Sequence, residues 1–113
     1  MKVLVFGYSE NPDRYSHMAA ELLLDYKHEV ITINPRQEDE LSKISTDYDT
    51  LTLYVNPQIS DKYEKILLKS KPKRVIFNPG TENESLEKKF ESLGVEVVIG
   101  CTLVMLRTNQ FDN

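Results

Sequence analysis

Short apolar runs alternate with amphipathic stretches along the whole chain. Val3–Phe6 is apolar on both faces and ends at Gly7, and the following Met18–Tyr26 carries apolar side chains at helical spacing. This pair of elements is typical of the first half of a βαβ unit. Continuation of the same alternation predicts strands over residues 3–6, 29–33, 50–55, 74–77 and 95–99.

The connecting segments predict helices of unequal strength. Helices are expected at about 16–26, with Ser16 as N-cap, at 38–43 and at 60–70. A further helix is predicted between a Thr81–Glu84 capping box and Gly94. The apolar tail from Cys101 to Leu106 is expected to dock on the sheet as a short helix.

Strands that alternate with helices indicate an α/β fold, a Rossmann-like three-layer sandwich whose five-stranded parallel sheet is covered on both faces. Right-handed crossovers suggest the strand order 3-2-1-4-5. The alternation of polar and apolar residues in 50–55 favours an edge position for the third strand. This order puts the switch point between strands one and four, so a ligand would lie across strands one, two and four.

Size and charge limit the classes of function. The 113 residues form one domain, residues 1–113, and the net charge of −4 argues against broad binding of nucleic acid or anionic membranes. Cys101 is the only cysteine, so no internal disulfide can form. No signal peptide and no apolar run of about 18 residues is seen, so we expect a cytoplasmic domain without a transmembrane helix.

Asn-Pro pairs occur four times, at residues 11–12, 34–35, 56–57 and 78–79, each at or just past the end of one of the first four strands. Proline lacks an amide donor and asparagine favours turns, so chain reversal alone can explain the pairs. The alternative explanation is that four rigid turns converge on one rim of the sheet and form a groove there. The sequence leaves both explanations open.

The loop after the first strand matches the dinucleotide fingerprint G-x-G-x-x-G at one position. Gly7 fits, but Ser9 and Pro12 stand where the other two glycines would be, so the loop is a poor NAD signature. Backbone amides near Tyr8–Asn11 and in the first turn of the helix remain candidates for phosphate binding.

The end of the second strand is more informative. NAD-binding folds place an acid there, whereas this chain has Asn34-Pro35-Arg36. A cation at this place suits a phosphate on a ribose, either the 2′-phosphate of NADP or the 3′-phosphate of coenzyme A, and Arg14 is positioned to assist. The alternative is that both arginines are solvated surface groups.

No catalytic or metal-binding set is evident. No cluster of His, Cys and Asp has metal-ligand spacing. His17 is interpreted as a helix-end histidine or a phosphate contact, and Cys101 as a buried thiol or a group facing pantetheine. The sequence therefore predicts a binding domain without a metal rather than an enzyme.

The chain resembles the small stand-alone CoA-binding domain family, which is related to the amino-terminal domain of the succinyl-CoA synthetase α subunit. The resemblance covers nearly the whole chain. It rests on Gly7–Ser16 (family pattern roughly G-A-S-x-x-P-x-R-x-S), Asn34-Pro35-Arg36 (family N-P-K/R), Val55-Asn56-Pro57 and the closing Cys101–Phe111. Tyr8 departs from the small residue usual in the family.

The resemblance implies a site at the carboxyl ends of the strands. The first loop and the Asn-Pro-Arg turn would hold the phosphates and ribose of CoA, the turn after strand three would lie beside the adenine, and the next turn would line the pantetheine. The residues implied as CoA-binding are Gly7, Tyr8, Ser9, Arg14, Ser16, Asn34, Pro35, Arg36, Asn56, Pro57, Asn78, Pro79, Gly80 and Thr81.

The synthetase's phosphohistidine segment and partner subunit have no counterpart in this chain. The expectation is therefore a domain that binds coenzyme A or an acyl-CoA without turnover, in a regulatory or carrier role. Two alternatives stay open: an NADP-dependent oxidoreductase with His17 or Tyr8 as proton donor, and an interaction module with a vestigial nucleotide site. Whether the chain forms a homo-oligomer or binds another protein is not decided by the sequence.

Overall fold

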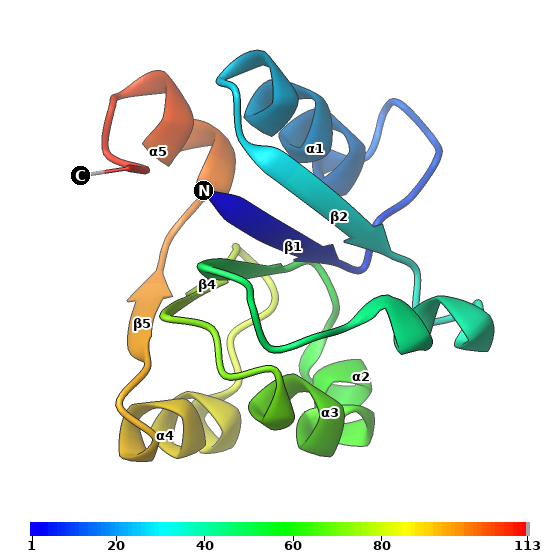
Figure 1. Ribbon diagram of the computed structural model, residues 1–113, viewed down its shortest axis with the longest axis vertical. Helices are drawn as coiled ribbons and strands as arrows, with labels where there is room; N and C mark the ends of the chain where they lie inside the picture. Colours follow the sequence, from blue (N-terminus) through cyan, green and yellow to red (C-terminus); the bar gives the residue numbers. More distant parts are fainter. Residues whose placement is uncertain (113) are drawn as a thin grey trace.

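The computed structural model describes residues 1–112 and shows a parallel sheet between two layers of helices (Figure 1). The α/β class predicted from the sequence is confirmed. Within the described residues, no helix is long and apolar enough to cross a membrane. The elements in chain order are β1 (Lys2–Phe6), α1 (Tyr15–Asp25), β2 (Glu29–Ile33), the 3-10 helix η1 (Glu38–Lys43), β3 (Thr50–Leu53), α2 (Pro57–Lys62), α3 (Glu64–Lys69), β4 (Arg74–Phe77), α4 (Glu84–Ser92), β5 (Glu96–Ile99) and α5 (Thr102–Arg107).

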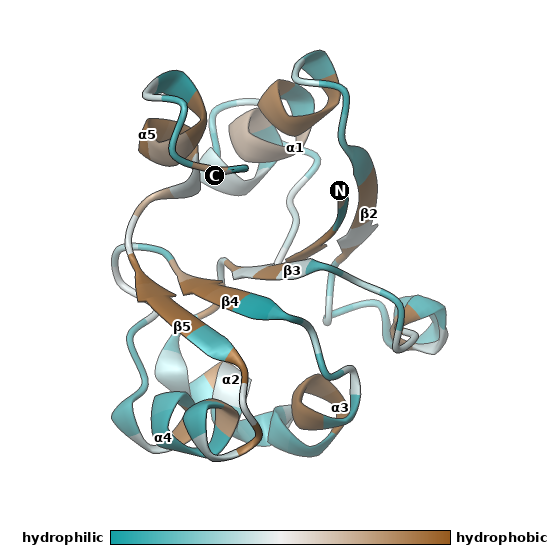
Figure 2. Ribbon diagram, turned by 60° about the vertical axis from the view of Figure 1, so that its left-hand side comes forward, coloured by the Kyte–Doolittle hydropathy of each residue, from teal (hydrophilic) through white to brown (hydrophobic). Residues whose placement is uncertain are grey.

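Two apolar clusters fill the spaces on either side of the sheet. Leu4 and Phe6 of β1 belong to the cluster beneath α3 and α4, whereas Val3 and Val5 belong to the cluster beneath α1 and α5. Because successive side chains of a strand point to opposite faces, a strand that feeds both clusters must be apolar throughout. Figure 2 shows the result, with the apolar strands enclosed between the two helical layers.

The strands lie in the order β2-β1-β3-β4-β5, so the predicted order 3-2-1-4-5 is wrong. β3 is not an edge strand, because it pairs with β1 on one side and β4 on the other. The edges are β2 and β5. The switch point consequently lies between β1 and β3, and not between the first and fourth strands as predicted.

The alternation within β3 has a different cause from solvent exposure. Thr50 and Thr52 are fully buried. The Oγ1 atom of Thr50 accepts a hydrogen bond from Nε of Arg74 at 3.1 Å, and the hydroxyls of Thr52 and Thr102 lie 2.8 Å apart. The polar half of the strand therefore faces buried polar partners contributed by later parts of the chain.

Helix starts differ from the predictions by one to three residues. Ser16 does not cap α1, whose N-cap is Arg14, and Asn83 rather than Thr81 caps α4 through a bond from the amide of Leu86 to Oδ1 of Asn83. The single helix predicted over 60–70 is two helices, α2 and α3, and the first begins at Pro57. Pro57 starts it early because a proline fits the first turn and Asn56 supplies the cap.

The carboxyl-terminal tail packs at the amino end of the sheet. Nη1 of Arg74 donates to the carbonyl of Phe111 at 2.6 Å, and the guanidinium lies 4.4 Å from the centre of the Phe111 ring. His28 contacts the same ring edge-on, with the ring centres 5.1 Å apart. The expected docking of residues 101–106 as a short helix is confirmed, because α5 covers most of this segment and Leu106 packs in the cluster that contains Val3 and Val5. The tail leaves the carboxyl ends of the strands uncovered.

His28 makes this end of the molecule sensitive to pH. Burial, and secondly the charged amino terminus, lower the pKa of His28, whose buried Nε2 has no hydrogen-bond partner within residues 1–112. The unfolded chain consequently binds more protons than the folded chain between this lowered pKa and the ordinary value of about 6.5. The contribution of neutral His28 to the free energy of unfolding is therefore fully present above about pH 6.5, and it is lost as the pH falls below this value.

We expect the free energy of unfolding to fall between about pH 7 and about pH 5.5, and we expect His28→Gln to reduce this fall. Urea unfolding of both proteins over this range measures the two slopes. All other titratable groups are present in both proteins, so the difference between the two slopes reports His28. Equal slopes would contradict the prediction.

Candidate functional site

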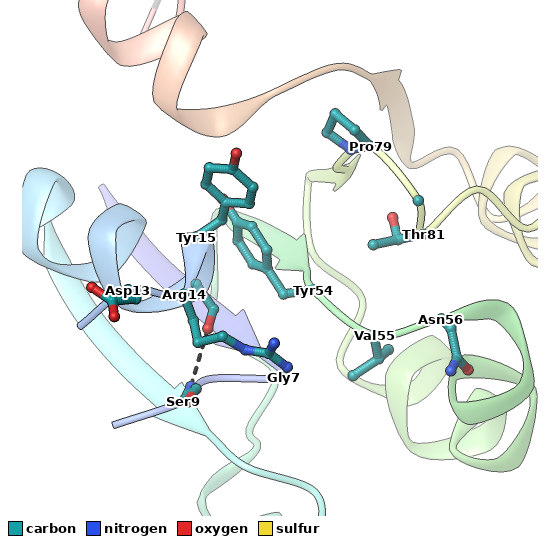
Figure 3. Close-up of a pocket in the computed structure, with 12 residues that line it drawn as sticks. Gly7, Ser9, Asp13, Arg14, Tyr15, Tyr54, Val55, Asn56, Pro79 and Thr81 are labelled. Atoms are coloured by element: carbon teal, nitrogen blue, oxygen red, sulfur yellow. Dashed lines mark hydrogen bonds between the residues drawn. The ribbon is translucent and has the colours of Figure 1, made fainter. Parts of the chain in front are cut away.

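A groove lies at the carboxyl ends of β1, β2 and β3. It consists of two adjoining hollows of about 350 and about 330 Å³, which is within the size range of small-molecule sites. Figure 3 shows the first hollow, between the start of α1 and the turn after β4. Both hollows are lined by Gly7, Ser9, Arg14, Tyr54, Val55 and Asn56.

Gly7 forms the floor where the two hollows meet. Its φ is +101°, and a Cβ built on it would lie 2.7 Å from Cγ1 of Val55 and 2.8 Å from the carbonyl of Tyr54. Its amide donates to the carbonyl of Ile33 at 2.8 Å. The chain that leaves β1 therefore passes in direct contact with the ends of both neighbouring strands, and only glycine permits this.

The first loop is folded back on the start of α1. The amide of Ser9 donates to Oγ of Ser16, and the amide of Asn11 donates to Oγ of Ser9, each at 3.1 Å. The amide of Tyr8 donates to a carbonyl of β2. Of the amides suggested for phosphate binding, those of Tyr8, Ser9 and Asn11 are therefore already engaged.

At the start of α1, the backbone amides of Tyr15 and Ser16 have no hydrogen-bond acceptor within the described residues. Both residues line the first hollow. Free amides at a helix start attract anions, because they are unpaired donors at the positive end of the helix dipole.

Arg14 and Arg36 line the same hollow, although they come from different loops. Both side chains are exposed, and neither forms a hydrogen bond or ion pair with the residues that the structure describes. Figure 3 shows the guanidinium of Arg14 directed towards Gly7. The carboxylate of Asp13 lines the first hollow only, so the second hollow has two cations and no acid in its lining.

The Asn-Pro pairs are explained in part by turn chemistry. Oδ1 of Asn11 accepts from the amide of Asp13, and Oδ1 of Asn34 accepts from the amide of Arg36, each at 3.0 Å. Oδ1 of Asn56 caps α2. These bonds hold the turns that carry Arg14 and Arg36, so turn formation and convergence on one rim are not alternatives here.

Asn78 has a different environment from the other asparagines. It is 1% exposed, and its Nδ2 donates to Oγ1 of Thr52 and to the carbonyl of Leu53, both at 2.7 Å. Its Oδ1 accepts from the amide of Thr102 at 2.9 Å. Its amide group is therefore fully used in joining β3, β4 and α5, so it belongs to the scaffold beneath the groove.

All of the implied site residues line one or both hollows except Pro57 and Asn78. Sequence reasoning missed five further lining residues. Tyr54 and Val55 precede the Asn56 turn, and Tyr15 follows Arg14. Their position next to these motifs in the sequence could have identified them as lining residues. Asp13 and Ile59 complete the set.

Tyr54 contributes its ring to both hollows and turns its hydroxyl inward. The hydroxyl is buried beside the side chains of Thr52 and Thr102. Burial raises the pKa of Tyr54, so the phenol stays neutral and does not act as a base.

Groups suited to covalent or metal chemistry are not gathered in the groove. No histidine or cysteine is among the residues that line either hollow, and Cys101 is half-buried elsewhere. Within residues 1–112, no three His, Cys, Asp or Glu side chains are grouped so that they could hold a metal. The hydroxyl of Thr81 donates to the carbonyl of Asn78 at 2.8 Å, so it too is engaged.

Comparison with known proteins gives one family and several related folds. The family model described as "CoA binding domain" matches residues 1–107. A crystal structure of an uncharacterised protein is 42% identical, with a TM-score of 0.86 over 97% of both chains. A conserved hypothetical protein from Pyrococcus furiosus is 26% identical, with a TM-score of 0.71 over 86% of this chain and 90% of that one.

A protein from Thermus thermophilus is 19% identical, with a TM-score of 0.80 over 97% of this chain and 90% of its own. At this identity the similarity shows the fold alone. No curated protein matches the chain.

Gly7→Ala is expected to destabilise the protein by at least about 3 kcal/mol, because the new methyl group meets backbone as well as an unfavourable φ. Gly94→Ala is the matched control. Its φ is +81°, and nothing lies within 4 Å of its added Cβ, so only the backbone penalty of about 1–2 kcal/mol applies. Urea denaturation measures both. Equal losses of unfolding free energy in the two variants would show that the contact with Tyr54 and Val55 adds nothing to the backbone penalty.

Asn78→Ala is expected to reduce the free energy of unfolding by about 3 kcal/mol, because it leaves buried donors and acceptors without partners. Asn56→Ala removes only a helix cap and is expected to lose about 1 kcal/mol. Denaturation curves of the two variants provide the test. If Asn78→Ala loses no more unfolding free energy than Asn56→Ala, then Asn78 is not needed for the scaffold and is again a candidate ligand contact.

Proposed function

Because the chain belongs to the family of CoA binding domains, we propose that its groove binds coenzyme A or an acyl-CoA. The observation that carries the proposal is the pair Arg14 and Arg36. The two residues line one hollow, and neither guanidinium has a partner within the described chain. Coenzyme A carries a pyrophosphate and a separate 3′-phosphate, so it offers two anionic groups to two cations.

The pyrophosphate is assigned to the start of α1. There the side chain of Arg14 and the free amides of Tyr15 and Ser16 border the first hollow. A guanidinium supplies charge and paired donors, and the amides supply fixed donors at the helix end. Neither contribution requires the loop to rearrange.

The 3′-phosphate is assigned to Arg36. This residue lines the second hollow and also a smaller one beside α2, where Lys62 adds a second cation and Glu38 an acid. Pro35, Ile59 and Tyr63 give that neighbouring hollow an apolar side suited to the adenine. The hydroxyl of Tyr63 donates to the carbonyl of Pro35 at 3.2 Å, which holds the turn against α2.

The pantetheine would then run through the first hollow towards Pro79 and Thr81. The lining hydroxyls there are already hydrogen-bonded within the protein, that of Ser16 to the amide of Ser9 and that of Thr81 to Asn78. The lining of this hollow has no histidine or cysteine, and its one carboxylate is that of Asp13. The proposal is therefore binding without turnover, in a regulatory or carrier role.

Calorimetric titration of coenzyme A and dephospho-CoA tests the two assignments separately. The wild-type protein is expected to bind coenzyme A about 10–100-fold more tightly, which corresponds to about 1.5–3 kcal/mol for hydrogen bonds to a charged group. Arg36→Gln is expected to remove this preference. Arg14→Gln is expected to weaken both ligands by the same factor, because both retain the pyrophosphate.

Arg107→Gln is the charge-matched control, since Arg107 ends α5 and is not among the residues that line the groove. It should change neither affinity. Equal wild-type affinities for the two ligands would refute the role of Arg36. Binding of NADPH but not of coenzyme A would support the oxidoreductase alternative, and binding of neither would support an interaction module.

A further inference from the structure

His17, in the first turn of α1, places both of its ring nitrogens against oxygen acceptors. Nδ1 lies 3.1 Å from the carbonyl oxygen of Ser9, and Nε2 lies 2.9 Å from a carboxylate oxygen of Glu21. Neither oxygen carries a proton that it can donate. A neutral imidazole donates from only one nitrogen, so in either neutral tautomer a lone pair on nitrogen would face a lone pair on oxygen.

Tyr8 supplies a third contact to the same ring. Its hydroxyl lies 3.1 Å from Nδ1 of His17, and the two rings are stacked with centres 5.6 Å apart and planes inclined by 23°. The hydroxyl can donate to Nδ1 of a neutral ring, but the carbonyl of Ser9 then remains opposed to that lone pair. A doubly protonated ring satisfies Ser9 and Glu21 together, and the face of a tyrosine ring attracts a cation.

We propose that His17 acts as an imidazolium that holds Ser9 closed on α1, and that loss of this proton loosens the groove and weakens the binding of its phosphorylated ligand. This inference rests on the proposed function and names a regulation of the same site. His17 lines neither hollow. It acts through Ser9, so it is a positioning residue.

Ser9 is the point at which the loop is tied to α1. Its amide donates to Oγ of Ser16 (the dashed line at Ser9 in Figure 3), and its carbonyl accepts from His17. Both of its backbone polar groups are therefore bonded to the first turn of the helix. Ser9 lines both hollows. The neutral ring keeps its one proton on Nε2, because the Glu21 carboxylate accepts there and the Tyr8 hydroxyl can donate to Nδ1. The bond from Nδ1 to the Ser9 carbonyl is then lost, and ordering the loop becomes a cost that ligand binding must overcome.

The charged groups around His17 favour coupling between proton and ligand. Glu21 faces it from α1 and Tyr8 from the loop, while Asp13 and Arg14 lie at the turn before the helix, with Arg14 directed towards the groove. A cation in the first turn opposes the helix dipole, and a phosphate bound at the same helix start offsets that repulsion. By linkage, a ligand that binds the protonated form more tightly also draws a proton onto the protein.

Calorimetry in two buffers of different ionisation enthalpy measures this proton uptake directly. Dephospho-CoA is the probe, because it lacks the phosphomonoester that itself titrates near pH 6. Wild-type protein is expected to take up a fraction of a proton on binding and to lose about tenfold in affinity from the acidic to the alkaline end of a pH series. His17→Gln is expected to bind more weakly than the wild type at the acidic end, with no change along the series and no proton uptake.

His28→Gln is the matched control, because the chain has two histidines and His28 lies at the opposite end of the sheet. It should retain the wild-type uptake. The same uptake and pH profile in wild type and His17→Gln would overturn the inference. Failure to bind either coenzyme A or dephospho-CoA at any pH would refute the proposed function, and the inference about His17 would then be decided by the following measurement.

Nitrogen-15 NMR of the ligand-free protein tests the device without any ligand. The shifts of the two His17 ring nitrogens should report a doubly protonated ring at the acidic end of the series. Amide exchange is base-catalysed, so the Ser9 rate is compared with that of His17→Gln at each pH. The ratio of the wild-type rate to the variant rate should rise as the His17 ring loses its proton, and not in parallel with the titration of His28. A neutral ring throughout the series, or a Ser9 exchange rate independent of His17, would overturn the inference.

Discussion

The close contact between Gly7 and the chain leaving β3 determines where the site can form. The amides of Gly7 and Tyr8 both donate to the carbonyl of Ile33, and the amide of Tyr54 donates to the carbonyl of Phe6. These bonds extend the pairing of β1 with both neighbours beyond the strands themselves. The three chains therefore leave the sheet side by side, and the loops that follow have to enclose a common groove. A side chain at position 7 would separate them, since its Cβ would lie 2.7 Å from Val55.

A second constraint holds the fourth turn in place from below. Asn78 joins Thr52 and Thr102 through buried hydrogen bonds, so the turn after β4 and the start of α5 are fixed relative to β3. At the other end of the sheet, Arg74 holds the carboxyl-terminal tail through Phe111. Buried polar groups are costly unless they are paired, and here each pairing fixes the position of a segment that would otherwise be mobile. The tail is thereby kept away from the groove.

The sequence predicted the elements well and their spatial order badly, for one physical reason. Apolar periodicity is local, so it identified strands such as Val3–Phe6 and Arg74–Phe77 nearly to the residue. The Thr50 hydroxyl also bonds to the adjacent Asp49, but the partners of Thr50 and Thr52 that tie β3 into the middle of the sheet are Arg74, Asn78 and Thr102. Those partners lie more than twenty residues away in the chain. A buried threonine and an exposed one look alike in a local pattern, so the interpretation as an edge strand failed.

The same distinction applies to the groove. Motifs at strand ends identified most of its lining, because the carboxyl ends of parallel strands share one rim. These motifs could not identify Asn78 as part of the scaffold, because its hydrogen-bond partners are distant in the sequence. They also missed Tyr54, which lines the groove where Gly7 allows the segments that follow β1 and β3 to touch.

What remains on the rim is a local excess of unpaired positive groups in a chain whose net charge is −4. Arg14, Arg36 and the free amides of α1 have no partner in the described structure, and the hollow that both arginines line has no acidic residue in its lining. Like charges without counter-ions do not stabilise a fold, and departures from the rules of stability are expected at functional sites. Under the proposed function, an anionic ligand would supply this counter-charge, and selection for binding rather than for stability would account for the arrangement.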